Sequence, residues 1–110
     1  MGEVGTSKIF ENDRIVIWEL LLEPGKQIAC HSHLHDYVFY VLEGSTIEAL
    51  DENDNPVLAF DANTGDVFAL GCEDGELIST DGKGLRVPAT HSARNIGASR
   101  YREILVETKK

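Results

Sequence analysis

Three histidines in this sequence have the residue type and the spacing that a metal site requires. His31 and His33 are two positions apart in GKQIACHSHLHDYVFYVLEG, and His91 lies far along the chain in VPATHSARN. Residues two apart on a β-strand project from the same face, about 6–7 Å apart, so both imidazoles can point at one ion. A third ligand from a distant strand would hold that ion more rigidly than a local loop. Neutral imidazole suits Fe, Zn, Cu and Ni better than Mg or Ca.

His-x-His alone is a weak indication of a metal site, because four histidines in 110 residues are an ordinary number. The surrounding residues make the pattern more specific. Pro24-Gly25 precedes the pair, a Tyr- and Val-rich run ending at Gly44 follows it, and Asn95 comes shortly after His91. We therefore predict one metal site that His31, His33 and His91 share.

The elements that must position these histidines read as short strands. Runs of β-favouring residues alternate with Gly, Pro, Asn and Asp. No stretch keeps a helical apolar period with capping residues for long enough to predict a helix. Short, regularly spaced strands predict an all-β sandwich or barrel, and the length predicts one domain over residues 1–110. The expected strands are 14–23, 27–31, 37–43, 46–50, 57–60, 67–70, 76–79, 85–87 and 100–107.

The first histidine segment resembles the first sequence motif of the cupin family. That motif reads Gly, five residues, His-x-His, three or four residues, Glu, six residues, Gly. Gly25, His31, His33 and Gly44 fall at those spacings, and Tyr37 stands at the position of the motif's Glu. The chain therefore departs from the family pattern at one ligand position.

The second histidine segment is similar to the second cupin motif, which reads Gly, five residues, Pro, x, Gly, two residues, His, three residues, Asn. Gly82, Pro88, His91 and Asn95 match parts of it, but the middle is contracted and the second Gly is missing. The resemblance covers roughly residues 14–107, and it extends loosely to small bacterial cupins associated with β-alanine degradation.

The resemblance implies a two-sheet jelly-roll barrel, or double-stranded β-helix, with a metal at its open end. The three histidines would be the ligands, with water or substrate in the open positions. Tyr37 has the strand parity of the missing Glu and is our candidate catalytic residue, either as a hydrogen-bond donor or as a general acid or base. It could also be a weak ligand, if a metal lowers its pKa from about 10, or simply an aromatic core residue.

Other polar groups near the histidines have their own interpretations. His35 shares the parity of His33, so it is either a further ligand or a histidine at the rim of the site. Cys30 is expected to be a small buried residue on the opposite face of its strand. Cys72, in GCEDGE, is expected on an exposed turn without a partner.

Two further groups of residues look like binding sites but have simpler explanations. Asp51, Asn53 and Asn55 alternate as in a calcium loop, yet the required Gly and bidentate Glu are absent, so we predict a hairpin turn. Three arginines could hold a substrate carboxylate, but among so many acidic residues we expect them to be solvated or paired: Arg94, Arg100 and Arg102.

The bulk composition bounds the partners and the compartment. Asp and Glu number 19 against 10 Lys and Arg, a net charge of -9 that repels phosphate backbones, so no nucleic-acid partner is expected. The polar N-terminus is not a signal peptide, no apolar run is long enough to span a membrane, and two cysteines make no disulfide framework. We expect a cytoplasmic protein. A homodimer is expected because edge strands need covering, with Trp18 and Tyr40 in the core or the dimer interface.

Two functions from different classes fit these features. The first is a mononuclear metal-dependent enzyme that acts on a small organic substrate. Fe(II) with dioxygenase-like chemistry is favoured there, and Zn, Ni or Mn with lyase or isomerase chemistry is next. The second is a non-catalytic, metal-stabilised module that binds or senses a small ligand. A water-excluding pocket beside an open metal position would favour the enzyme, and a metal with every position filled by protein would favour the second. A barrel without metal is the third possibility, against which the intact histidine trio argues.

Overall fold

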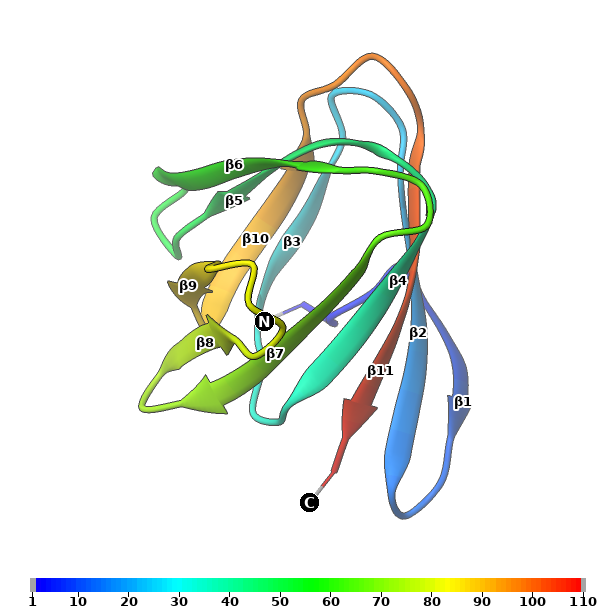
Figure 1. Cartoon of the computed structure of the whole chain (residues 1–110), viewed down its shortest axis with the longest axis vertical. Coiled ribbons are helices and arrows are strands. Elements are labelled where there is room, and N and C mark those ends of the chain that lie inside the picture. The colour runs from blue at the N-terminus through cyan, green and yellow to red at the C-terminus, as the bar shows by residue number, and fades with distance from the viewer. Residues whose placement is uncertain (1, 110) are drawn as a thin grey trace.

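The computed structural model describes residues 2–109, which form eleven β-strands and no helix (Figure 1). The all-β prediction is therefore confirmed, and no helix in this part of the chain is long and apolar enough to cross a membrane. The strands are β1 Ser7–Glu11, β2 Ile15–Leu22, β3 Gln27–Ser32, β4 Tyr37–Glu43, β5 Ser45–Leu50, β6 Pro56–Ala62, β7 Val67–Glu73, β8 Glu76–Ser79, β9 Arg86–Pro88, β10 Thr90–Asn95 and β11 Tyr101–Thr108.

The strands form two antiparallel sheets. Over residues 2–109 the larger sheet has seven strands in the order β1-β2-β11-β4-β7-β8-β9, and the smaller has four in the order β3-β10-β5-β6. Figure 1 shows the two sheets as opposite walls of one barrel, with the β2–β3 and β10–β11 connections together at one end. The chain crosses repeatedly between the sheets, as a jelly roll does, so the predicted double-stranded β-helix is confirmed.

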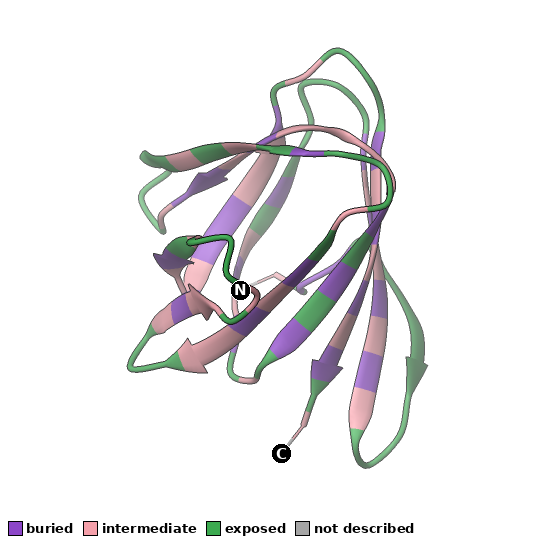
Figure 2. Ribbon diagram, in the orientation of Figure 1, coloured by how far each residue is buried: buried purple, intermediate pink, exposed green. Residues whose placement is uncertain are grey.

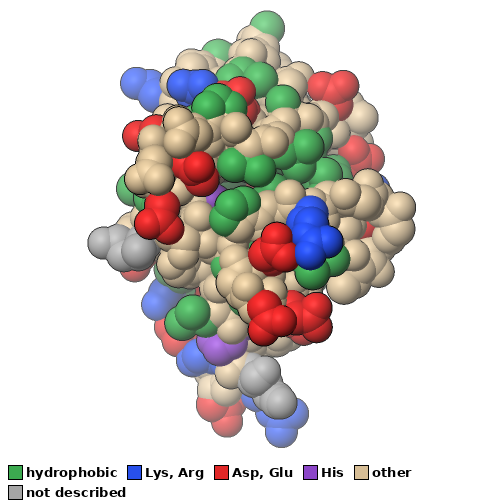
Figure 3. Space-filling model, turned by 90° about the vertical axis from the view of Figure 1, so that its left-hand side faces the viewer, with side chains coloured by type: hydrophobic (Ala, Val, Ile, Leu, Met, Phe, Trp, Pro, Cys, Tyr) green, Lys and Arg blue, Asp and Glu red, His purple; other side chains and the backbone are tan. Residues whose placement is uncertain are grey.

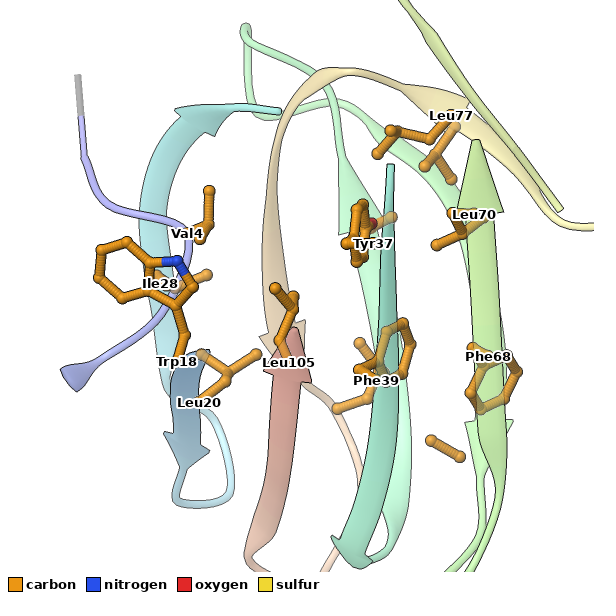
Figure 4. Packing of buried hydrophobic residues seen from close by; sticks show 14 of the residues in the cluster. Val4, Trp18, Leu20, Ile28, Tyr37, Phe39, Phe68, Leu70, Leu77 and Leu105 are labelled. Atoms are coloured by element: carbon orange, nitrogen blue, oxygen red, sulfur yellow. The ribbon is translucent and has the colours of Figure 1, made fainter. Parts of the chain in front are cut away.

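Alternating apolar side chains explain how the larger sheet closes over the core. Along β2 and β4 the residues that face the smaller sheet are buried and their neighbours are more exposed, which gives the banding in Figure 2. Figure 4 shows Trp18 and Leu20 on β2, Leu105 on β11 and Phe39 on β4 pointing into this core. Trp18 is therefore a core residue.

Asn95, the last residue of β10, hydrogen-bonds to residues at the ends of neighbouring strands and in the β10–β11 loop. It is fully buried. Its side-chain nitrogen donates to the carbonyl oxygens of Leu22 (2.9 Å) and Ser99 (2.7 Å). Its Oδ1 accepts from the Ser45 hydroxyl (2.8 Å) and the Gly97 amide (3.0 Å). Every hydrogen-bonding position of this amide is used, so the asparagine of the second motif has a structural role.

We expect Asn95→Ala to lower the free energy of unfolding by about 2 kcal/mol, because it leaves buried donors and acceptors without partners. Urea denaturation of the two proteins measures the difference. Asn53→Ala, in the exposed turn between β5 and β6, is the control and should change stability by less than about 0.5 kcal/mol. Equal effects of the two substitutions would contradict the structural role of Asn95.

The turn between β5 and β6 confirms that the calcium-like segment is a hairpin. The backbone amides of Asn53 and Asn55 donate to Oδ1 of Asp51 at 2.9 and 3.0 Å. Asp54 has a φ of 62°, a left-handed conformation that aspartate tolerates in tight turns. The side chain that would be the first calcium ligand is therefore occupied by its own turn.

The outer face of the larger sheet carries exposed apolar side chains. Val38 and Tyr40 on β4 and Val67 on β7 are exposed. Ile104 and Val106 on β11 are half-buried directly beside them, paired with Tyr40 and Val38. Tyr40 thus lies outside the core, on a surface of the kind that forms interfaces. The homodimer stays a prediction, and this face is the surface on which to test it.

Candidate metal centre

His31 and His91 come together because β3 and β10 are neighbours in the smaller sheet. The two residues are direct cross-strand partners. The register shifts between them and the next pair, Ile28 with Ala93, so that β3 has one residue more than β10. This β-bulge lets Ile28 and His31 both face the barrel interior although they are three residues apart. Without the bulge, strict alternation from Ile28 would turn Cys30 inward and His31 outward.

His33 completes the group from just beyond the end of β3. Its backbone amide donates to the carbonyl oxygen of Ala89 at 2.9 Å, which fixes the segment against the loop before β10. All three histidines are buried, and their candidate ligand nitrogens lie within 4.8 Å of one another. The ring centroids are 4.9 Å apart for His31 and each of the others, and 5.0 Å apart for His33 and His91. The structure thus brings together the three residues that the sequence predicted as ligands.

Backbone carbonyls orient two of the three imidazoles. Nδ1 of His31 lies 2.9 Å from the carbonyl oxygen of Ala29, and Nδ1 of His91 lies 2.7 Å from that of Pro88. A carbonyl only accepts hydrogen bonds, so each Nδ1 carries the proton and each Nε2 keeps a free lone pair. Nδ1 of His33 is buried and has no hydrogen-bond partner among the described residues. An all-nitrogen donor set with one unpartnered buried nitrogen fits a transition-metal ion.

Burial keeps these imidazoles in the form that binds metal. Burial lowers the pKa of His31, His33 and His91, and for His33 and His91 the neighbouring histidines lower the pKa further. Each ring is therefore neutral near pH 7, and a ligand histidine must be neutral. Three uncharged ligands would leave a divalent ion with its full charge.

Tyr37 packs directly on the histidine group. Its ring is stacked on that of His33, with centroids 4.3 Å apart and an angle of 16° between the planes. It is buried, as its strand parity predicted. Burial, followed by the nearby Glu103, raises the pKa of Tyr37 well above its ordinary value. The phenol therefore keeps its proton and can donate a hydrogen bond inside the barrel.

The structure separates His35 from the histidine group. His35 is half-buried in the bend between β3 and β4, and it is not among the residues whose ligand atoms converge. The alternative in which it is a rim histidine agrees with this position. Cys30 is half-buried on the other side of β3 from His31, close to the prediction.

Cys72 corrects a prediction, because it is not on an exposed turn. It is half-buried in β7, and its thiol donates to the backbone carbonyl of His33 at 3.3 Å. Burial and the nearby Asp36 raise the pKa of this thiol. GCEDGE reads as a turn because Asp74-Gly75 is one, but β7 continues up to Glu73. Cys72 thus supports the segment that carries His33.

The three arginines are paired with acidic side chains, as the sequence predicted. Arg94 binds Glu48 at 2.5 Å, and Arg100 binds Glu43 at 2.9 Å. Arg102 bridges Glu43 and Glu19 on the outside of the larger sheet. These guanidinium groups serve the surface of the barrel and do not face its interior.

A cavity of about 70 Å³ lies between the sheets, beside the histidine group. Most of its wall is apolar, and the polar side chains on it are the three histidines, two tyrosines and Glu103. Leu58 and Phe60 on β6 and Leu85 before β9 line it while only half-buried, so the cavity approaches the surface between β6 and β9. Figure 3 shows this side of the molecule, where hydrophobic side chains gather among acidic ones.

Two buried carboxylates on β11, Glu103 and Glu107, were missed by the sequence analysis. Glu103 lines the cavity, and its Oε1 accepts a hydrogen bond from Tyr101 at 2.6 Å. Glu107 is the cross-strand partner of Tyr37 and accepts from the indole nitrogen of Trp18 at 3.0 Å. Neither carboxylate is part of the converging group. A fourth, acidic ligand is therefore not supplied at the cluster by the described residues.

The fold itself is shared with known cupins. The chain is similar to a cupin domain from Bordetella pertussis Tohama I, at 16% sequence identity and a TM-score of 0.67, over 94% of this chain and 91% of that one. It is also similar to an uncharacterized conserved protein with a double-stranded β-helix domain from Klebsiella pneumoniae, at 19% identity and a TM-score of 0.59, over 93% of this chain and 73% of that one. The chain thus has the fold of small cupin domains.

A third similar structure has a stated activity. It is a sugar phosphate isomerase from the cupin superfamily of Silicibacter pomeroyi, at 18% identity and a TM-score of 0.55, over 88% of this chain and 52% of that one. No protein-family model matches the sequence, and no curated protein is significantly similar to it. The candidate site is therefore defined by this chain's own residues. It consists of a three-histidine group that could bind a metal ion, beside an apolar cavity.

Proposed function

We propose that this chain is a mononuclear metal-dependent enzyme that acts on a small organic molecule. The observation that carries the proposal is the group of three buried, neutral histidines on the wall of an apolar cavity. His31, His33 and His91 would hold one divalent transition metal, with Fe favoured and Zn, Ni or Mn next. Three protein ligands leave coordination positions open for substrate, as catalytic sites require.

The bound ion would supply a positive charge that polarises a substrate oxygen or, as Fe(II), dioxygenase-like activation of O₂. The chain's own residues have separate tasks. Ala29 and Pro88 hold the rings of His31 and His91 by their carbonyl oxygens. Tyr37, stacked on His33, donates a hydrogen bond to the substrate and is the proposed catalytic residue. The apolar wall limits water near the reacting atoms.

The cavity favours some substrates over others. Among the described residues that line it there is no Lys or Arg, so a phosphate or a second carboxylate would be buried without a counter-charge. The sugar-phosphate chemistry of the Silicibacter pomeroyi structure is therefore not our proposal for this chain. A small, uncharged or weakly basic organic substrate suits the wall better.

Element-resolved mass spectrometry of protein purified anaerobically without a His tag tests the proposal. We expect about one transition-metal ion per chain, and with iron we expect O₂ uptake when small organic substrates are added. Zinc, nickel or manganese would direct the substrate search to isomerase and lyase reactions. No metal, even after reconstitution with each ion, would overturn the proposal. Stoichiometric metal without turnover of any substrate would favour the non-catalytic binding module.

A further inference from the structure

Glu103 is a buried acid that the proposed reaction does not use. It is 5% exposed on the inner face of β11, and it lines the cavity together with Tyr101, which is 1% exposed. The Tyr101 hydroxyl donates a hydrogen bond to Oε1 of Glu103 at 2.6 Å. A carboxylate has about four acceptor positions, so Glu103 can accept further hydrogen bonds from a molecule in the cavity that it lines.

Among residues 2–109, no cationic side chain pairs with Glu103. Its chain neighbour Arg102 points to the outside of the sheet, where it binds Glu19 and Glu43. On the neighbouring strand β4 of the same sheet, the cross-strand partner of Glu103 is the fully buried Val41. A molecule in the cavity would therefore offer this carboxylate a hydrogen-bond donor or a positive charge.

Glu103 and the histidine group start from different levels of the cavity wall, and the Tyr37 side chain lies near both. Along β11 and β4, Glu103 is paired with Val41, whereas the Tyr37 that stacks on His33 is paired with Glu107. At about 3.3 Å per residue, four residues along β11 separate these two levels by roughly 13 Å of strand. Apolar side chains of Phe39 and Leu105, a cross-strand pair, lie between them. On the backbone, the apolar pair Phe39 and Leu105 thus lies between the levels of Glu103 and Glu107.

We propose that Glu103 forms a binding subsite for the O–H or N–H donor of a small alcohol or amine whose apolar part lies against Phe39 and Leu105. A cavity of about 70 Å³ has room for roughly five water-sized atoms, so the ligand is a short-chain one. Carboxylates are excluded, because their negative oxygens would face Glu103. The inference deepens the proposed function by naming its substrate class, but the subsite exists without any metal.

Ligand preference of the metal-free protein tests the subsite. Chemical-shift titration of the full chain at pH 8 compares n-butylamine and n-butanol with butyrate, a carboxylate of the same length. We expect the amine and the alcohol to bind at least about tenfold more tightly than butyrate, with shifts at Phe39 and Leu105. Burial raises the pKa of Glu103 to about 7, so the carboxylate is mostly ionised at this pH.

Glu103→Gln should lose the preference for butylamine over butyrate, since the amide is neutral and can also donate. Glu107→Gln, which changes the other buried carboxylate on the same strand, should keep it. Equal binding of butyrate and butylamine by the wild-type protein, or no binding of any of the three, would overturn the subsite even if a variant failed to fold. Because no metal is present in this titration, a protein that binds no metal would overturn the proposed function and leave this result standing.

Discussion

His91→Ala is expected to weaken metal binding by about 100-fold or more. Structural sites with four ligands bind Zn²⁺ with a free energy of about 10–16 kcal/mol, so one ligand contributes about 3 kcal/mol. The site proposed here has three ligands. The loss should be large because the described residues bring no further histidine, cysteine or carboxylate to the group. Titration of the metal-free protein with Zn²⁺ against a chelator, and with Fe²⁺ under anaerobic conditions, measures the dissociation constants.

The control for this experiment is His35→Ala. His35 is half-buried in the bend after the histidine pair but lies outside the converging group. Its removal should leave the dissociation constant within about twofold. If His91→Ala bound metal as tightly as the wild-type protein, the distant strand would not supply a ligand, and the site would have to be reassigned.

The sequence alone predicted the strands whose alternation is clear. In β4 the apolar residues Tyr37, Phe39 and Val41 share one parity and are buried, as expected. The range of β1 was missed, and no range was given for the strand expected at His91, because SKIFE and THSARN mix polar and apolar residues without a simple period. β10 is a strand because it pairs on both sides, with β3 and β5, and such pairing is a tertiary fact that no local pattern contains.

The histidine group was predictable from motif spacing, but the way it forms was not. Parity explains His31 with His33, yet His31 faces inward with Ile28 only because of the bulge in β3. A bulge shifts parity by one residue, and nothing in QIACHS indicates where it falls. The prediction of two inward imidazoles was therefore correct, but the inward direction of His31 depends on a bulge in the pairing of β3 with β10.

Glu103 was not predictable because the sequence pattern of β11 favours the wrong face as the buried one. RYREILVE places Ile104 and Val106 on one parity and Tyr101, Glu103 and Leu105 on the other. Hydrophobicity alone favours the face with Ile104 and Val106 as the buried one. The structure buries Tyr101, Glu103 and Leu105 and leaves Ile104 and Val106 half-buried on the outer side of the larger sheet. The same misleading pattern thus explains why the buried Glu103 and the apolar outer surface were both missed.

Glu103 should make the metal-free protein less stable as the pH rises from about 4.5 to 7. Burial raises the pKa of its carboxyl from 4.5 to about 7 in the folded state. Between these values the unfolded chain releases the proton and the folded protein keeps it, so ionisation favours unfolding. A difference of about 2.5 pKa units corresponds to about 3 kcal/mol. The titratable side chains close to it are Tyr101 on β11 and Tyr37 on β4, and burial keeps both protonated in this range.

Glu103→Gln removes this titration while keeping an acceptor for Tyr101. The free energy of unfolding of the variant minus that of the wild-type protein should therefore be about 3 kcal/mol larger at pH 8 than at pH 4. Urea denaturation across this range measures the difference between the two proteins. The lowered histidine pKa values oppose the trend below about pH 6.5, but the histidines are common to both proteins and cancel in the comparison. Glu52→Gln, on the exposed β5–β6 turn, controls for the change in net charge. Parallel curves for wild type and Glu103→Gln would mean that Glu103 is ionised or solvated in the folded barrel, and the acceptor proposed for an alcohol or amine would then already be satisfied by water.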